Sequence, residues 1–124
     1  MEKEDMIRRY FDAWLKKDSS CLPSVFSNKA VYSECYGPEY FGIKQISQWF
    51  DDWNKQGTVL KWKIKQFIQQ GDAVVAEWYF ECDYKGSRSS FDGASIVHFD
   101  ESGKIDLLKE FQSKSAHSFP YGKL

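Results

Sequence analysis

The chain has little cysteine and histidine: three Cys and two His in 124 residues. Cys21, Cys35 and Cys82 are odd in number and irregularly spaced, which argues against a fold built on disulfides and is typical of reduced cytoplasmic thiols. Together with His98 they lack the spacing of a zinc site, so we expect no metal. Glycine-rich phosphate loops and the G-x-S-x-G element are also missing. We therefore expect no nucleotide cofactor and no serine-hydrolase chemistry.

An excess of charge and a long hydrophobic run are missing as well. Seventeen basic residues stand against eighteen acidic ones, a net charge of -1. A nucleic-acid partner requires clustered positive charge. No window approaches the roughly 20 apolar residues of a membrane helix, and the first residues lack the apolar core of a secretory signal. We expect a soluble cytoplasmic protein that binds neither membrane nor nucleic acid.

Aromatic residues, in contrast, are abundant. They make up 18% of the chain, with five Trp, seven Tyr and ten Phe. That is more ring area than a small core needs, and residues 1–124 fit a single domain. The composition predicts one hydrophobic core with room for one aromatic-lined cavity.

The first half of the chain alternates between helical and extended patterns. Residues 6–15 carry one apolar stripe at helical period, and a short second helix is expected around 22–26. Residues 30–36 alternate as a strand does, and Gly37-Pro38 ends that pattern. A third helix is expected over 43–56. These elements give the order helix, helix, strand, helix.

The second half of the chain has only strand patterns. Period-two alternation covers 58–69, 73–84, 91–99 and 105–113, with short turns between them. Short turns between consecutive strands indicate an antiparallel meander. The full order, α-α-β-α-β-β-β-β, predicts an α+β fold with helices gathered on one face of an antiparallel sheet.

Four segments in this order resemble the SnoaL-like (polyketide cyclase-like) family of the nuclear transport factor 2-like superfamily and, more distantly, ketosteroid isomerase. The segments are R-Y-F-D-A-W (9–14), Y-G-P-E-Y-F-G (36–42), I-S-Q-W-F-D-D-W (46–53) and F-D-G-A-S-I-V-H-F-D-E-S-G-K-I (91–105). The resemblance implies a cystatin-like cone, with the sheet wrapped around the N-terminal helices. Because this fold hosts many functions, the resemblance indicates the fold better than the reaction.

Two side chains are candidates for acid–base catalysis. Tyr10 lies on the inward stripe of the first helix, where its hydroxyl needs a partner. Glu34 shares a strand face with Tyr32 and Tyr36, and burial of that face would raise its pKa. By resemblance, Tyr10 falls on the isomerase's catalytic tyrosine and Glu34 on its general base. A core tyrosine bonded to a backbone carbonyl and a half-exposed carboxylate at the cone mouth remain the alternatives.

The last strands supply further candidates. By resemblance, the face of Leu108, Glu110 and Gln112 looks into the cavity, where the two polar groups could orient a ligand. The opposite arrangement, with Phe111 inside, stays open. By resemblance, Val97 stands where the isomerase has the second acid of its oxyanion hole, so steroid isomerisation is not expected.

The expected pocket is therefore mainly aromatic and suits a small apolar or aromatic ligand. We expect its lining to be Trp14, Tyr32, Tyr36, Trp49, Trp62, Trp78, Phe80, Val97, Leu108, Glu110 and Gln112. His98 is expected to point outward, and His117 lies in a tail that could fold over the mouth.

Two functions remain open on the sequence. The first is binding of a small apolar molecule, with acid–base catalysis of isomerase, cyclase or dehydratase type at Glu34 and Tyr10. The second is a non-catalytic binding or dimerisation module whose cavity is filled by side chains. An open pocket within reach of Glu34 and Tyr10 would favour the first.

A homodimer is also expected from the strand over 73–84. Glu77, Tyr79 and Glu81 alternate there with inward Trp78 and Phe80. Bulky residues on the second face of a sheet usually need a cover. We expect that outer sheet face to pair with a second copy of the chain.

Overall fold

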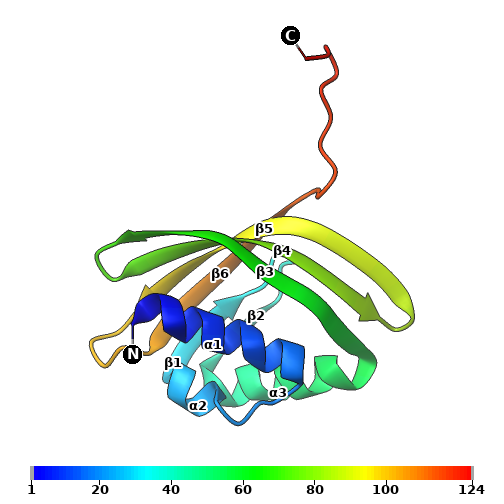
Figure 1. Ribbon diagram of the computed structural model, residues 1–124. Coiled ribbons are helices and arrows are strands. Elements are labelled where there is room, and N and C mark those ends of the chain that lie inside the picture. Colours follow the sequence, from blue (N-terminus) through cyan, green and yellow to red (C-terminus); the bar gives the residue numbers. More distant parts are fainter. Residues whose placement is uncertain (1, 124) are drawn as a thin grey trace.

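The computed structural model describes residues 2–123, which form three helices and six strands (Figure 1). The helices are α1 (Lys3–Lys16), α2 (Leu22–Val25) and α3 (Gly42–Gln56). The strands are β1 (Phe26–Ser33), β2 (Glu39–Phe41), β3 (Gly57–Gln70), β4 (Ala73–Tyr84), β5 (Ser87–Phe99) and β6 (Ile105–Ser113). All three predicted helices and all five predicted strands are present, with β2 in addition. β1 lies earlier than the predicted 30–36, so Glu34 and Tyr36 follow the strand instead of belonging to it.

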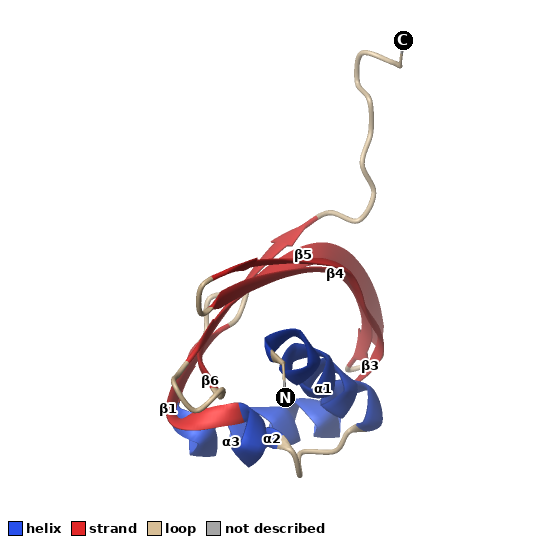
Figure 2. Ribbon diagram, turned by 60° about the vertical axis from the view of Figure 1, so that its left-hand side comes forward, coloured by secondary structure: helices blue, strands red, loops and turns tan. Residues whose placement is uncertain are grey.

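The amphipathic pattern of α1 explains its position. Its apolar stripe, which includes Ile7, Tyr10 and Trp14, is buried. Its first turn carries Glu4 and Asp5, whose negative charges are stabilised by the positive end of the helix dipole. α1 therefore lies in the hollow of the sheet, which curls around it (Figure 2).

The sheet has the strand order β2-β1-β6-β5-β4-β3. β3 to β6 form the expected antiparallel meander. β1 joins this meander through a parallel ladder with β6, and β2 pairs antiparallel with the far side of β1. The predicted α+β fold with a curved sheet around helices is confirmed, and the structure adds β2 and one parallel ladder.

A glycine on β5 allows the concave face to hold its largest side chain. Trp78 of β4 lies opposite Gly93, and its indole nitrogen donates to the hydroxyl of buried Ser95 at 3.0 Å. A Cβ at Gly93 would overlap Cη2 of Trp78 and would lie 2.5 Å from the carbonyl oxygen of Phe111. Only glycine therefore fits beneath this indole.

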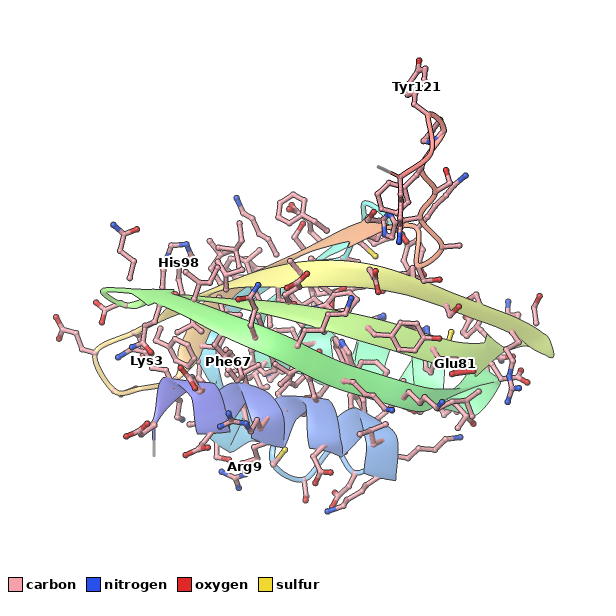
Figure 3. All side chains as sticks on the ribbon, turned by 45° about the horizontal axis from the view of Figure 1, so that its top comes forward. Lys3, Arg9, Phe67, Glu81, His98 and Tyr121 are labelled. Atoms are coloured by element: carbon pink, nitrogen blue, oxygen red, sulfur yellow. The ribbon has the colours of Figure 1, made fainter. Side chains whose placement is uncertain are left out.

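The convex face of the sheet points away from the helices, and the C-terminal tail leaves from the same side (Figure 1). Glu81 and His98 point outward there, and the residues after Ser113 run away from the sheet to the exposed Tyr121 (Figure 3). His117 lies 3.5 Å from the carboxylate of Asp92, which points to this outer face. The expectation that His117 could cover the cavity mouth is therefore wrong. None of the helices within residues 2–123 is long and apolar enough to span a membrane.

Candidate functional site

An open cavity of about 720 Å³ lies between the concave face of the sheet and α3. Eleven aromatic side chains line this cavity. They come from α1, α3, the β1–β2 loop and every strand except β6. They are Trp14, Tyr32, Tyr36, Tyr40, Trp49, Trp53, Trp62, Trp78, Phe80, Tyr84 and Phe91. The volume is typical of a small-molecule site. The alternative of a cavity filled by side chains is therefore wrong.

One carboxyl group, that of Glu110, reaches the cavity from β6. The parallel ladder places Tyr32 opposite Leu108, so Glu110 lies just beyond Tyr32 on the same face, and the Tyr32 hydroxyl donates to Oε2 of Glu110. Burial raises the pKa of Glu110 from its ordinary 4.5 to about 7. The Tyr32 hydrogen bond opposes this rise in the pKa, and the negative charge of Glu34 adds to it.

A second carboxyl group, that of Glu34, follows the end of β1. A tight turn holds it, because its N–H donates to the carbonyl of Pro38 at 2.9 Å and its own carbonyl accepts from the N–H of Gly37 at 3.1 Å. The Tyr40 hydroxyl donates to Oε2 of Glu34 at 2.8 Å. Burial raises the pKa of Glu34, and the hydrogen bond from Tyr40 lowers it in part. The alternative of a half-exposed carboxylate is correct for the burial of Glu34, which is half-buried. Its side chain nevertheless lines the cavity.

The two carboxyl groups have no basic partner in the part of the chain that the structure describes. Within residues 2–123, neither Glu34 nor Glu110 forms a salt bridge. Lys55 is the basic residue of the cavity lining within that range, and it lies at the rim, 3.9 Å from Asp52. The cavity is therefore lined mainly by aromatic side chains, with the carboxyl groups of Glu34 and Glu110 unpaired by any basic group of the described residues.

Tyr10 does not line the cavity. It is fully buried, with its ring edge-on to Phe26 at 5.0 Å and to Tyr32 at 5.8 Å. Its hydroxyl has no hydrogen-bond partner among residues 2–123, so the alternative of a bond to a backbone carbonyl is not seen either. The expectation that Tyr10 and Glu34 share one cavity is wrong, because the ring of Tyr10 packs into the core behind the cavity wall.

Three other expected pocket residues also lie elsewhere. Val97 and Leu108 are fully buried and do not reach the cavity surface. Gln112 is exposed and borders a shallow groove outside the mouth. Phe111 is 54% exposed on the outer face, so the arrangement with Phe111 inside does not occur. The remaining expected residues do line the cavity: Trp14, Tyr32, Tyr36, Trp49, Trp62, Trp78, Phe80, Glu110 and Glu34.

Sequence reasoning missed several lining residues. Tyr40 belongs to the short strand β2, which lies in the Y-G-P-E-Y-F-G segment quoted for the family resemblance. Cys35 also lines the cavity, and burial raises the pKa of its thiol to about 12. Cys35 therefore remains a neutral thiol and is a poor nucleophile. Among residues 2–123, no group of His, Cys, Asp and Glu is arranged to hold a metal ion.

A curved sheet that wraps helices and encloses an aromatic cavity defines a class of small α+β domains with a cystatin-like fold. Residues 7–107 match the model of the SnoaL-like domain, and the chain belongs to this family. The family resemblance in the sequence is thereby confirmed. No curated protein matches the chain significantly.

Solved structures support the same fold. A protein of ketosteroid isomerase-like fold from Catenulispora acidiphila, in complex with trimethylamine, is 20% identical, with 87% of this chain and 85% of that chain covered and a TM-score of 0.78. An LEH-like epoxide hydrolase from M. tuberculosis is 15% identical, covering 90% and 82% with a TM-score of 0.80. A protein with a cystatin-like fold from Xanthomonas campestris is 16% identical, covering 92% of both chains with a TM-score of 0.76.

Proposed function

We propose that the chain binds a small, largely apolar molecule in the aromatic cavity and transfers a proton to or from it through Glu110 and Glu34. The observation that carries this proposal is the Glu110 carboxyl, which lies in an apolar cavity and has a pKa of about 7. An acid–base catalyst works best when its pKa is near the working pH. The reaction would be of isomerase, cyclase or dehydratase type.

The two carboxyl groups are suited to different roles. The pKa of Glu34 is raised less than that of Glu110, so at neutral pH Glu34 is the better candidate for the ionised base. Glu110 is then partly protonated and is the candidate acid. Pairs of carboxyl groups whose environments separate their pKa values commonly divide acid and base roles in this way. Tyr32 and Tyr40 orient these groups through their hydroxyls.

The similar structures give general support to a small organic ligand. One of them was solved in complex with trimethylamine and another is an epoxide hydrolase. Both have a curved sheet like the one that encloses this cavity.

The experiment is a metabolite-library screen followed by proton transfer measurements in D₂O. A ligand at 100 times its Kd should stabilise the fold by about 2.7 kcal/mol and so raise the Tm. Each hit is then incubated with the protein in D₂O, and its C–H signals are followed by NMR. We expect deuterium exchange or conversion with the wild type and with Glu101→Gln, a control in the exposed β5–β6 turn.

Loss of the carboxyl groups should separate binding from chemistry. In Glu34→Gln and Glu110→Gln, exchange should fall by about 10²-fold or more, the usual contribution of a positioned acid or base. Hits that bind without exchange or conversion by the wild type would contradict the proton-transfer role. A library without any hit would contradict the binding role.

We further propose a homodimer that forms through the outer sheet face. Ile68, Val75 and Ile96 are cross-strand neighbours on that face, and Ala94 pairs with the exposed Phe111 in the next row. This apolar row continues a face on which Tyr79 also points outward. A patch of this kind usually marks an interface.

Light scattering tests the dimer. The wild type should have twice the mass of the 14.5 kDa chain at micromolar concentration. Phe111→Lys should shift it to the single-chain mass with little change in Tm, because this ring is mostly exposed in the monomer. A wild type with the single-chain mass would refute the dimer.

A cytoplasmic location is also part of the proposal. Cys21, Cys35 and Cys82 are all free thiols, as is typical of reducing compartments. Fractionation of expressing cells would test it.

A further inference from the structure

We propose that the ligand of this cavity is an organic cation, a protonated or quaternary amine with apolar substituents, whose ammonium group lies between the aromatic rings and the carboxyl groups of Glu34 and Glu110. We also infer that its binding displaces a proton from Glu110. This inference rests on the proposed binding function. With a cationic ligand bound, Glu110 would be ionised and could act only as a base, so the acid role of Glu110 applies to uncharged ligands.

The charge balance of the cavity is the first argument. Glu34 and Glu110 receive hydrogen bonds from phenol hydroxyls, and neither has a salt-bridge partner among the described residues. At the rim, Lys55 is already beside Asp52. Partly buried carboxylates are unfavourable unless a positive charge or strong donors compensate them. Apart from Lys55, which lies beside Asp52, residues 2–123 supply no positive charge to the cavity lining, and a cationic ligand would provide one.

The aromatic walls beside these carboxyl groups are the second argument. Tyr40, which bonds Glu34, is stacked on Trp49 with ring centroids 4.7 Å apart. Tyr32, which bonds Glu110, lies 4.8 Å from the same Trp49. Trp and Tyr rings attract cations through their negative faces, and aromatic cages are the usual sites for quaternary ammonium groups. Both carboxyl groups thus lie next to one cluster of Tyr and Trp rings.

The size of the cavity limits the ligand further. A volume of about 720 Å³ is far more than a bare ammonium ion requires. The rest of the lining is mainly aromatic and includes Phe80, Trp78 and Phe91, with Gln56, Ser87 and Ser89 among its polar residues. The cation should therefore carry aliphatic or aromatic groups that cover these rings. An inorganic cation would leave most of the cavity unfilled.

The groups around Glu110 determine the proton coupling. The titratable groups that face Glu110 or line its cavity come from α1, α3, β2, β4, and β1 with the loop after it. They are Tyr10, Tyr32, Glu34, Cys35, Tyr36, Tyr40, Asp52, Lys55, Cys82 and Tyr84. The phenols and thiols that carry an upward pKa shift stay neutral near pH 7. Glu34 disfavours a second negative charge on Glu110. A bound cation reverses this balance and favours the ionised carboxylate.

The experiment compares cations with uncharged molecules of the same shape. Benzyltrimethylammonium and choline are titrated calorimetrically into the full chain, with 3,3-dimethylbutan-1-ol as the uncharged analogue of choline. We expect choline to bind at least about tenfold more tightly than the alcohol. Cation affinity should rise about tenfold between pH 6 and pH 8, with release of nearly one proton at pH 6 and almost none at pH 8, because Glu110 must ionise. Glu110→Gln should lose this pH dependence, and Glu101→Gln should keep it.

The possible outcomes distinguish this inference from the proposed function. If the uncharged alcohol binds as tightly as choline, or if neither cation binds while neutral library hits do, the cation inference is overturned and small-molecule binding stands. If cations bind with an affinity independent of pH, the proton coupling is overturned. If neither the cations nor any library member binds, the proposed function itself fails.

Discussion

Replacing Gly93 with alanine is expected to destabilise the fold by about 3 kcal/mol or more, the upper part of the range for overpacked cores. The added methyl group would overlap Cη2 of Trp78 and press on the carbonyl oxygen of Phe111. Trp78 cannot easily move, because it is buried and its indole nitrogen donates to Ser95. Urea unfolding followed by circular dichroism would measure the loss.

A matched control lies on the same strand. Ser90→Ala changes an exposed residue of β5 and should alter the free energy of unfolding by less than about 0.5 kcal/mol. Wild-type stability in Gly93→Ala would show that the indole does not rest on this glycine. Because Trp78 is part of the cavity wall, ligand binding should weaken together with stability.

The second large effect is a fall in stability between pH 4.5 and pH 7, the ordinary and the folded-state pKa of Glu110. The folded state holds this proton more tightly than the unfolded chain. The free energy that this proton contributes to folding is therefore complete below pH 4.5, and it is lost as the pH rises through about 7. A difference of this size corresponds to about 3 kcal/mol. Glu34, whose pKa is also raised, acts in the same direction.

Glu110→Gln isolates this contribution. The variant should show a much flatter free energy of unfolding across the same pH range, and it should be more stable than the wild type above pH 7. Asp18, Asp92 and Asp100 have lowered pKa values and lose their contribution only at lower pH. Parallel pH curves for wild type and variant would contradict the raised pKa of Glu110.

Most of the fold could be predicted because its signals are local. Alternation along β4 places Trp78 and Phe80 inside, and helical period places Tyr10 on the buried stripe of α1. β2 was missed because it has three residues, two of them exposed, and follows Gly37-Pro38. The parallel ladder of β1 with β6 was missed because no turn joins the two strands.

The candidate site was harder to predict, because contacts between distant segments decide whether an inward side chain ends in the core or at the cavity surface. The stripe of α1 shows that Tyr10 points inward, but not that its ring would pack edge-on against Tyr32 and Phe26 in the core. Periodicity grouped Glu34 with Tyr32 and Glu110 with Leu108, and the family resemblance indicated that the face of Glu110 looks into the cavity. Only the β1–β6 register shows that the hydrogen bond to Glu110 comes from Tyr32, 78 residues earlier in the chain.

That register has a consequence for protein synthesis. β6 lies between β1 and β5, so the first strands can join the sheet only after the last strand has left the ribosome. Until then, β1 and β2 have no neighbour in the meander, and Tyr32 has no Glu110 to bond. An intact cavity therefore requires that every strand through residue 113 has been made and has joined the sheet.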